Sequence, residues 1–423
     1  MLADKFIPQK PFPEFKWRWA SKECTEGLNE PLILLGVLYR LHKLDNKNLT
    51  YSSPEFAAEM KSLENEVKKN IDFNVNLATR TGERNLMRNS KQYWTSLGLV
   101  ENASKGIIKL TDFGREISER NISQAEFAAI TIQTHTLPNY RIMPLEECKV
   151  WEKHGIKLHP LKLLLQILRN LYIKDKNSAY ITRNELCDVI IPLSGTKTAE
   201  IEDFVHFVIK YRNHPENFKD WPNCCTGAND KRIAREFLLF LKYYGYVNLN
   251  KNEKTNNATE QYFYNYTLDN EISEIINDKY NNITLIQARN NFKNDDAVTS
   301  ELERKRIKYA NNRPNQAKFR KQILDEYKHC IITNIEMPEV LEAAHIVPFA
   351  YHGEDSIANG FPLRSDIHIL FDTGNLRISP EGDVVLSEKA RYNYGMTIPR
   401  QIVIPAQINK DFIKWRWENY SGL

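Results

Sequence analysis

Four polar side chains near the C-terminal end of the chain have the types and order needed to hydrolyse a phosphodiester bond: His345, Asn359, His368 and Asp372. A histidine can remove a proton from water near neutral pH, and His345 is the candidate for this role. An imidazole nitrogen and a carboxylate oxygen one helical turn apart, as in His368 and Asp372, provide half of a divalent metal site. A cation there would stabilise charge on the phosphate and on the leaving oxygen. Asn359 could hydrogen-bond across the intervening loop and orient His345.

The segments around these residues predict a strand, a loop, a second strand and a short helix. Residues 340–347 are short, apolar and bounded by prolines, which favours a strand that carries the first histidine. A polar loop follows and ends at the turn pair Asn359-Gly360, and residues 361–363 can return as the second strand. Ser365 is the predicted N-cap of a helix over residues 366–372.

The full string resembles the HNH (ββα-metal) endonuclease family, in a branch that recurs in restriction endonucleases. Its parts read C-I-I-T, then L-E-A-A-H-I-V-P, then N-G-F-P-L-R-S-D-I-H-I-L-F-D-T-G. The resemblance implies that His345 is the general base, that Asn359 orients it, and that His368 is a further catalytic residue. It also implies that His368 and Asp372 hold the metal, Mg²⁺ or Mn²⁺, and that Arg364 contacts a phosphate.

The string departs from the family pattern in two places. Many HNH cores carry Asp or His directly before the first histidine as a metal ligand, whereas this chain has Ala344. The missing ligand would then be water, Asp355 or Glu342. Many also carry paired C-x-x-C motifs, and because this region has only Cys330, no structural zinc is expected.

Composition indicates a soluble globular protein of two or three domains. The chain has 423 residues, of which 42% are hydrophobic and 26% are charged. Its net charge of +4 is too small to indicate a nucleic-acid partner by itself. The basic block over residues 301–321 is more informative, because clustered cations suit phosphate contact; its candidate DNA-binding residues are Arg304, Arg306 and Lys318.

Cysteine usage and the N-terminus favour a cytoplasmic location. The six cysteines are scattered apart from Cys224-Cys225, so no disulfide framework is legible. The start of the chain has no apolar signal core, and no apolar run is long and uninterrupted enough to predict a membrane span.

The region before the nuclease-like string predicts an α+β chain that is mostly helical, with two winged-helix-like modules. Residues 50–125 and 180–268 each show helices followed by two short strands, a weak internal repeat. Lys231 and Arg235 lie on the polar face of a basic helix in the second module and are candidate DNA contacts. The expected domains are an N-terminal arm and first module (1–125), a helical connector and second module (126–270), a linker (271–300) and the HNH nuclease domain (301–423).

The combined prediction is a Type II restriction endonuclease that cuts double-stranded DNA at or near a specific sequence, with Type IIS cutting beside the site as one form. Its expected partners are double-stranded DNA, a second copy of the chain on that DNA, and a cognate DNA methyltransferase; no membrane partner is expected. Two alternatives remain open. One is a modification-dependent DNA nuclease, and the other is a non-catalytic winged-helix DNA-binding regulator with a degenerate nuclease domain.

Overall fold

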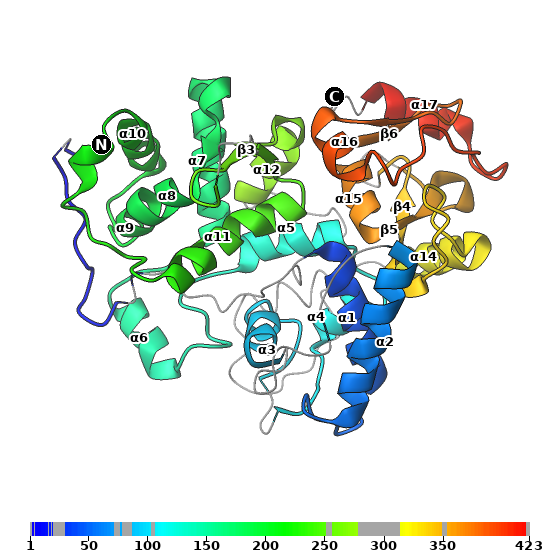
Figure 1. Cartoon of the computed structure of the whole chain (residues 1–423), viewed down its shortest axis with the longest axis horizontal. Coiled ribbons are helices and arrows are strands. Elements are labelled where there is room, and N and C mark those ends of the chain that lie inside the picture. The colour runs from blue at the N-terminus through cyan, green and yellow to red at the C-terminus, as the bar shows by residue number, and fades with distance from the viewer. Residues whose placement is uncertain are drawn as a thin grey trace. The chain divides into compact units, whose positions relative to one another are not determined.

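The computed structural model describes residues 2–3, 5–15, 17, 19, 30–71, 77, 87–102, 106–250, 256–277, 314–348 and 353–419. The described chain is α+β, as predicted, with many helices and three small antiparallel sheets (Figure 1). It forms two compact units: unit 1 is Met1–Glu23 with Thr131–Lys279, and unit 2 is Cys24–Ile130 with Tyr280–Leu423. This grouping differs from the consecutive segments expected from the sequence, because α1 (Pro31–Leu44) contacts α15 (Ser365–Asp372).

Unit 1 combines helices with a three-stranded antiparallel sheet of order β1-β3-β2. A capping box at Thr182 and Glu185 opens α8. The N-terminal arm packs in this unit, where the indole Nε1 of Trp19 donates to Ser194 Oγ at 3.1 Å. The elements are α6 (Leu145–Lys153), α7 (Pro160–Lys174), β1 (Tyr180–Ile181), α8 (Arg183–Glu185), α9 (Ile191–Leu193), α10 (Ile201–Asn213), α11 (Ala228–Tyr243), β2 (Val247–Asn250), β3 (Gln261–Tyr264) and α12 (Asp269–Ile276).

The first part of unit 2 is helical. Two strands were expected around residues 97–100 and 107–111, but the described backbone there makes single bridges, Val100 to Leu110 and Thr50 to Ile107. The wing between these strands is predicted at residues 102–106, and its centre, residues 103–105, lies outside the described residues. The helices are α1, α2 (Pro54–Ile71), α3 (Met87–Ser96), α4 (Asp112–Ser118) and α5 (Gln124–Thr134), of which the last runs on into unit 1.

The second part of unit 2 contains the predicted strand, loop, strand and helix. β4 (Leu341–His345) pairs antiparallel with β5 (Gly360–Arg364), which places His345 opposite Gly360. α15 follows without a break, and α14 (Pro314–Tyr327) and α15 both contact the β4–β5 pair. Ser365 is the first residue of α15, not its N-cap; Arg364 holds that position without a side-chain cap. The remaining elements are β6 (Leu376–Ile378), β7 (Val384–Leu386), α16 (Glu388–Tyr394) and α17 (Lys410–Asn419).

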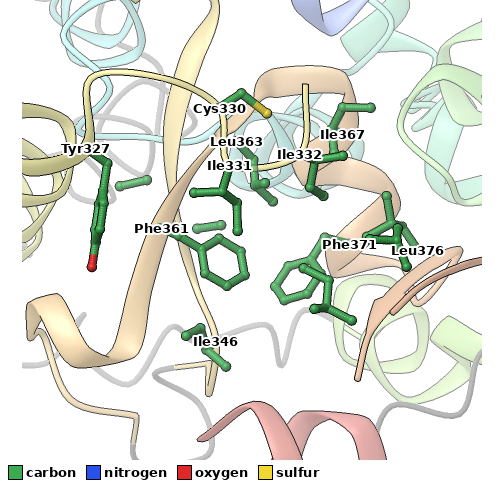
Figure 2. Close-up of a cluster of buried hydrophobic side chains, with 14 of the residues drawn as sticks. Tyr327, Cys330, Ile331, Ile332, Ile346, Phe361, Leu363, Ile367, Phe371 and Leu376 are labelled. Atoms are coloured by element: carbon green, nitrogen blue, oxygen red, sulfur yellow. The ribbon is translucent and has the colours of Figure 1, made fainter. Parts of the chain in front are cut away.

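An apolar core fixes the β4–β5 pair to the helix that follows it. Phe361 of β5 and Phe371 of α15 lie with ring centroids 5.3 Å apart, at the centre of the cluster in Figure 2. Burial of such side chains contributes about 1.5–3 kcal/mol each, so the core holds strand and helix in one register. None of the helices in the described part of the chain is long and apolar enough to cross a membrane.

Candidate active site

The first histidine lies at the end of β4 against an aromatic ring. The imidazole of His345 stacks on Phe319 of α14, with ring centroids 4.0 Å apart and an interplanar angle of 18°. The opposite residue of the ladder is Gly360, where an added Cβ would lie only 2.4 Å from Phe319 Cζ. Glycine is therefore required at this position for the phenyl ring to reach the histidine.

A carboxylate orients the same histidine. His345 Nε2 lies 2.9 Å from Asp355 Oδ1. Because a carboxylate only accepts, Nε2–H donates to it, and Nδ1 is the nitrogen left with a free lone pair in the neutral ring. Burial lowers the pKa of His345, although the hydrogen bond and charge of Asp355 act to raise it. The neutral, proton-accepting form is therefore favoured near neutral pH.

The second histidine is held between two carboxylates. His368 Nδ1 lies 2.9 Å from Glu342 Oε2, and His368 Nε2 lies 3.1 Å from Asp372 Oδ2. Burial acts to lower the pKa of His368, but Asp372 and Glu342 raise it to about 10. Burial acts to raise the pKa of Asp372, but the positive charges of His368 and Arg416 lower it. In this arrangement an imidazolium holds the two carboxylates together.

An arginine from α17 completes the surroundings of Asp372. Arg416 Nη1 donates to the carbonyl oxygen of Ile346 at 2.9 Å, and Nη2 donates to that of Phe371 at 2.7 Å and to Asp372 Oδ1 at 3.4 Å. It therefore joins the end of β4 to the end of α15. The sequence analysis did not identify this residue, and its only local signal is its position between two tryptophans in the tail.

Asn359 fixes the loop after β4 and makes no recorded contact with His345 itself. Its Oδ1 accepts from Val347 N–H at 2.8 Å, and its Nδ2 donates to the carbonyl oxygens of Val347 at 3.0 Å and Glu354 at 2.9 Å. The loop backbone is tight here, because a Cβ on Gly353 would lie 1.8 Å from Val347 O. Asn359 thus positions the backbone that leaves His345.

Replacement of Asn359 by alanine should destabilise the protein by on the order of 3 kcal/mol, because it leaves buried backbone groups of the loop without partners. The Asn359 side chain is fully buried, so water cannot replace the lost bonds in place. Urea unfolding followed by fluorescence measures the change. Asn393→Ala, at an exposed position on α16, is the control, and an equal loss in both variants would contradict the role given to Asn359.

The predicted phosphate-binding residues of unit 2 lie in different environments. Arg364 is buried in a bidentate pair with Asp366, at 2.7 and 2.9 Å. In this arrangement the Arg364 guanidinium is therefore occupied by Asp366 and does not face a DNA phosphate. Lys318 is exposed on α14, next to Phe319, and is available to an anion. Arg304 and Arg306 lie outside the described residues.

The two candidates in unit 1 lie on α11. Arg235 pairs with the buried carboxylate of Glu260 at 2.6 Å and also donates to Tyr262 Oη at 3.0 Å. It therefore stabilises the junction between α11 and β3. Lys231 is half-buried near the start of the same helix.

The donor atoms fit a cation that is held in part by water and substrate. No group of three or more His, Cys, Asp or Glu side chains that could hold a metal occurs among the residues that the structure describes. Glu342 and Asp355, the acidic candidates for the missing ligand, hydrogen-bond to the histidines instead. His368 Nε2 and Asp372 Oδ2 form an ion pair at 3.1 Å, and a cation bound there would replace the proton between them. Mg²⁺ commonly takes one or two protein ligands together with waters and phosphate oxygens.

Comparison with known proteins confirms the predicted family of this segment. Residues 330–379 match the model of the HNH endonuclease family, so this segment is similar to HNH endonucleases. No curated protein sequence matches the chain at a significant level. Among solved structures, the binding domain of the BpuJ1 endonuclease in complex with pyrene- and phenanthrene-modified DNA aligns with a TM-score of 0.41 and 13% identity. That alignment covers 68% of this chain and 95% of the other.

Proposed function

We propose that this protein is a metal-dependent Type II restriction endonuclease that hydrolyses double-stranded DNA at or near a specific sequence. The observation that carries the proposal is the arrangement of two histidines within the HNH segment. His345 is oriented by Asp355 with Nδ1 left as an acceptor, and His368 is oriented by Glu342 with Nε2 beside Asp372. His345 is thus prepared to accept a proton. His368 Nε2 carries a proton toward Asp372 in this arrangement and would become a metal ligand only when a cation displaces that proton.

The proposed reaction is a direct attack of water on the phosphodiester. His345 Nδ1 removes a proton from the water as its oxygen bonds to phosphorus, and the bond to the leaving oxygen breaks. Asp355 then stabilises the imidazolium formed on His345, as a carboxylate behind a histidine does in other hydrolases. A divalent cation bound by His368 and Asp372 would supply positive charge to the phosphate and the leaving oxygen.

Sequence selection is proposed to reside in the helical regions outside the HNH segment. Contacts to phosphate position a protein on DNA but carry no sequence information directly, so a selective nuclease needs a reader of base edges or DNA shape. The helices and small sheet of unit 1 support the winged-helix-like interpretation of residues 180–268. Lys231 and Lys318 are the described cations proposed to contact phosphate. Dimerisation on DNA, Type IIS cutting and a partner methyltransferase belong to the same proposal.

Cleavage should require a divalent cation. Supercoiled plasmid incubated with the protein and Mg²⁺ or Mn²⁺ should be converted to linear fragments with defined ends, and excess chelator should abolish conversion while DNA binding in a gel-shift assay persists. Sequencing of the ends gives the cut position, and methylated and unmethylated plasmids separate a restriction enzyme from a modification-dependent one. Cleavage that continues unchanged in chelator would contradict the proposal.

Two observations favour a non-catalytic DNA-binding protein as the second candidate. Arg416 already neutralises Asp372, and Ala344 supplies no ligand. In that case the same assay would show sequence-dependent binding without strand breaks under any cation tested.

A further inference from the structure

Glu342 uses both carboxylate oxygens inside the protein. It lies on β4 on the face opposite His345, with its side chain only 1% exposed. Oε2 accepts from His368 Nδ1–H at 2.9 Å, and Oε1 accepts from the backbone N–H of Gln124, also at 2.9 Å. A buried carboxylate is stable only when its oxygens have such partners. Loss of one contact would therefore leave Glu342 less firmly held for the other.

The second contact comes from the N-terminal part of unit 2. Gln124 is the first residue of α5, and the first N–H groups of a helix have no partner within it. The helix end also carries partial positive charge, which favours an anion. The turn is itself fixed, because Ser123 N–H donates to Glu126 Oε2 at 2.8 Å and Glu126 N–H donates to Ser123 Oγ at 3.2 Å.

The same turn is tied to the elements around both histidines. Arg120 Nε donates to the carbonyl oxygen of Leu341, next to Glu342, at 2.9 Å. Arg320 of α14 pairs with Glu126 at 2.9 Å, and the neighbouring residue, Phe319, is the one stacked on His345. The segment 120–126 therefore contacts both β4 and α14, although it lies far from the HNH segment in sequence.

We propose that Glu342 is the positioning residue of His368 and that the first turn of α5 holds Glu342 in place for this purpose. The proposal rests on the function proposed above. While His368 Nδ1–H donates to Glu342, Nε2 is the nitrogen that would bind a cation beside Asp372 once the cation displaces its proton. Carboxylates that orient a metal-binding histidine in this way fix its tautomer and ring orientation, and their loss typically costs about 10–100-fold in metal affinity or activity.

The first experiment compares Glu342→Gln with Glu339→Gln. Both glutamates join the HNH segment to the N-terminal helices, and Glu339 does so by pairing with Arg40 at 3.3 Å without touching a histidine. A carboxamide can accept only on one side, so Glu342→Gln must lose either the His368 or the Gln124 contact. We expect Glu342→Gln to raise the Mg²⁺ concentration for half-maximal cleavage by about 10–100-fold, with KM for DNA unchanged. Glu339→Gln should keep the wild-type value.

The second experiment removes only the anchoring N–H. Proline is well suited to the first position of a helix and has no N–H, so Gln124→Pro deletes the donor without breaking α5. Gln124→Ala is its control, because it loses the same side chain and keeps the N–H. We expect Gln124→Pro to shift the Mg²⁺ dependence in the same direction as Glu342→Gln, and Gln124→Ala to shift it far less.

A spectroscopic measurement separates this proposal from the proposed function. The measurement uses full-length protein labelled with ¹⁵N-histidine, first in metal-free buffer and then in buffer that contains Mg²⁺. His368 Nδ1 should keep its proton in both buffers. In Glu342→Gln this proton should be lost or should exchange rapidly. If the wild-type protein does not cleave DNA, the nuclease proposal fails while the Nδ1–H resonance still tests Glu342. The positioning role is overturned if Glu342→Gln and Glu339→Gln behave alike in both measurements. Should Glu342→Gln fail to fold, equal behaviour of Gln124→Pro and Gln124→Ala overturns it instead.

Discussion

Replacement of His345 by alanine should reduce the rate of DNA cleavage by roughly two to four orders of magnitude, the range that general-base catalysis typically contributes. The effect is expected to be large because the histidine is prepared for one task. Phe319 packs on its face, and Asp355 fixes which nitrogen is free. Alanine removes the base and leaves the Asp355 carboxylate without its partner. Single-turnover cleavage at saturating Mg²⁺ measures the chemical step directly.

His329→Ala is the matched control for this variant. His329 directly precedes the matched residues 330–379 and is half-buried, but its side chain lies outside the site around His345 and His368. Binding of the DNA should survive in both variants, since phosphate contacts elsewhere dominate affinity. The assignment of the base would be wrong if His345→Ala cut DNA at a rate within tenfold of the wild-type protein.

Replacement of Asp372 by asparagine should reduce cleavage at a fixed low Mg²⁺ concentration by at least about a hundredfold, since metal ions contribute several kcal/mol of charge stabilisation. Asparagine keeps an oxygen for Arg416 but removes the charge that would bind a cation. Its NH₂ group would also face His368 Nε2, which Asp372 now contacts at 3.1 Å. Higher Mg²⁺ should restore part of the rate, and a Mg²⁺ titration of the cleavage rate measures this.

Asp383→Asn is the control for the second variant, because Asp383 is an exposed carboxylate at the turn between β6 and β7. It should leave the Mg²⁺ titration curve unchanged. If Asp372→Asn also leaves the curve unchanged, then Asp372 stabilises the fold through its ion pair with Arg416, and the cation binds elsewhere.

The sequence predicted those parts of the site that depend on local geometry. The helix that carries His368 and Asp372 was expected over residues 366–372, and it forms as α15 with the two side chains in contact. The i, i+4 spacing of a helix is enough to bring such a pair together. The strand that carries His345 was expected for a similar reason, because its short apolar run lies between two prolines.

Contacts that depend on tertiary packing could not be predicted in this way. The sequence analysis considered Glu342 and Asp355 as metal ligands, and the structure places them on the histidines. Whether a carboxylate faces a cation or an imidazole depends on the ring's direction, which neighbouring strands and helices set. Arg416 reaches Asp372 from α17, and no spacing rule connects residues so far apart in the chain.

Because the two units are interleaved along the chain, recombination between genes has a limited ability to exchange one unit for another. Each unit takes one stretch from before Ile130 and one from after it, so no single break in the backbone separates unit 1 from unit 2. A genetic crossover near residue 300 that brought in a foreign HNH segment would also replace the partners of Gln124 and Arg120. New combinations of reader and nuclease would then require matched exchanges at two places, which ties the evolution of the C-terminal quarter to that of the first 130 residues.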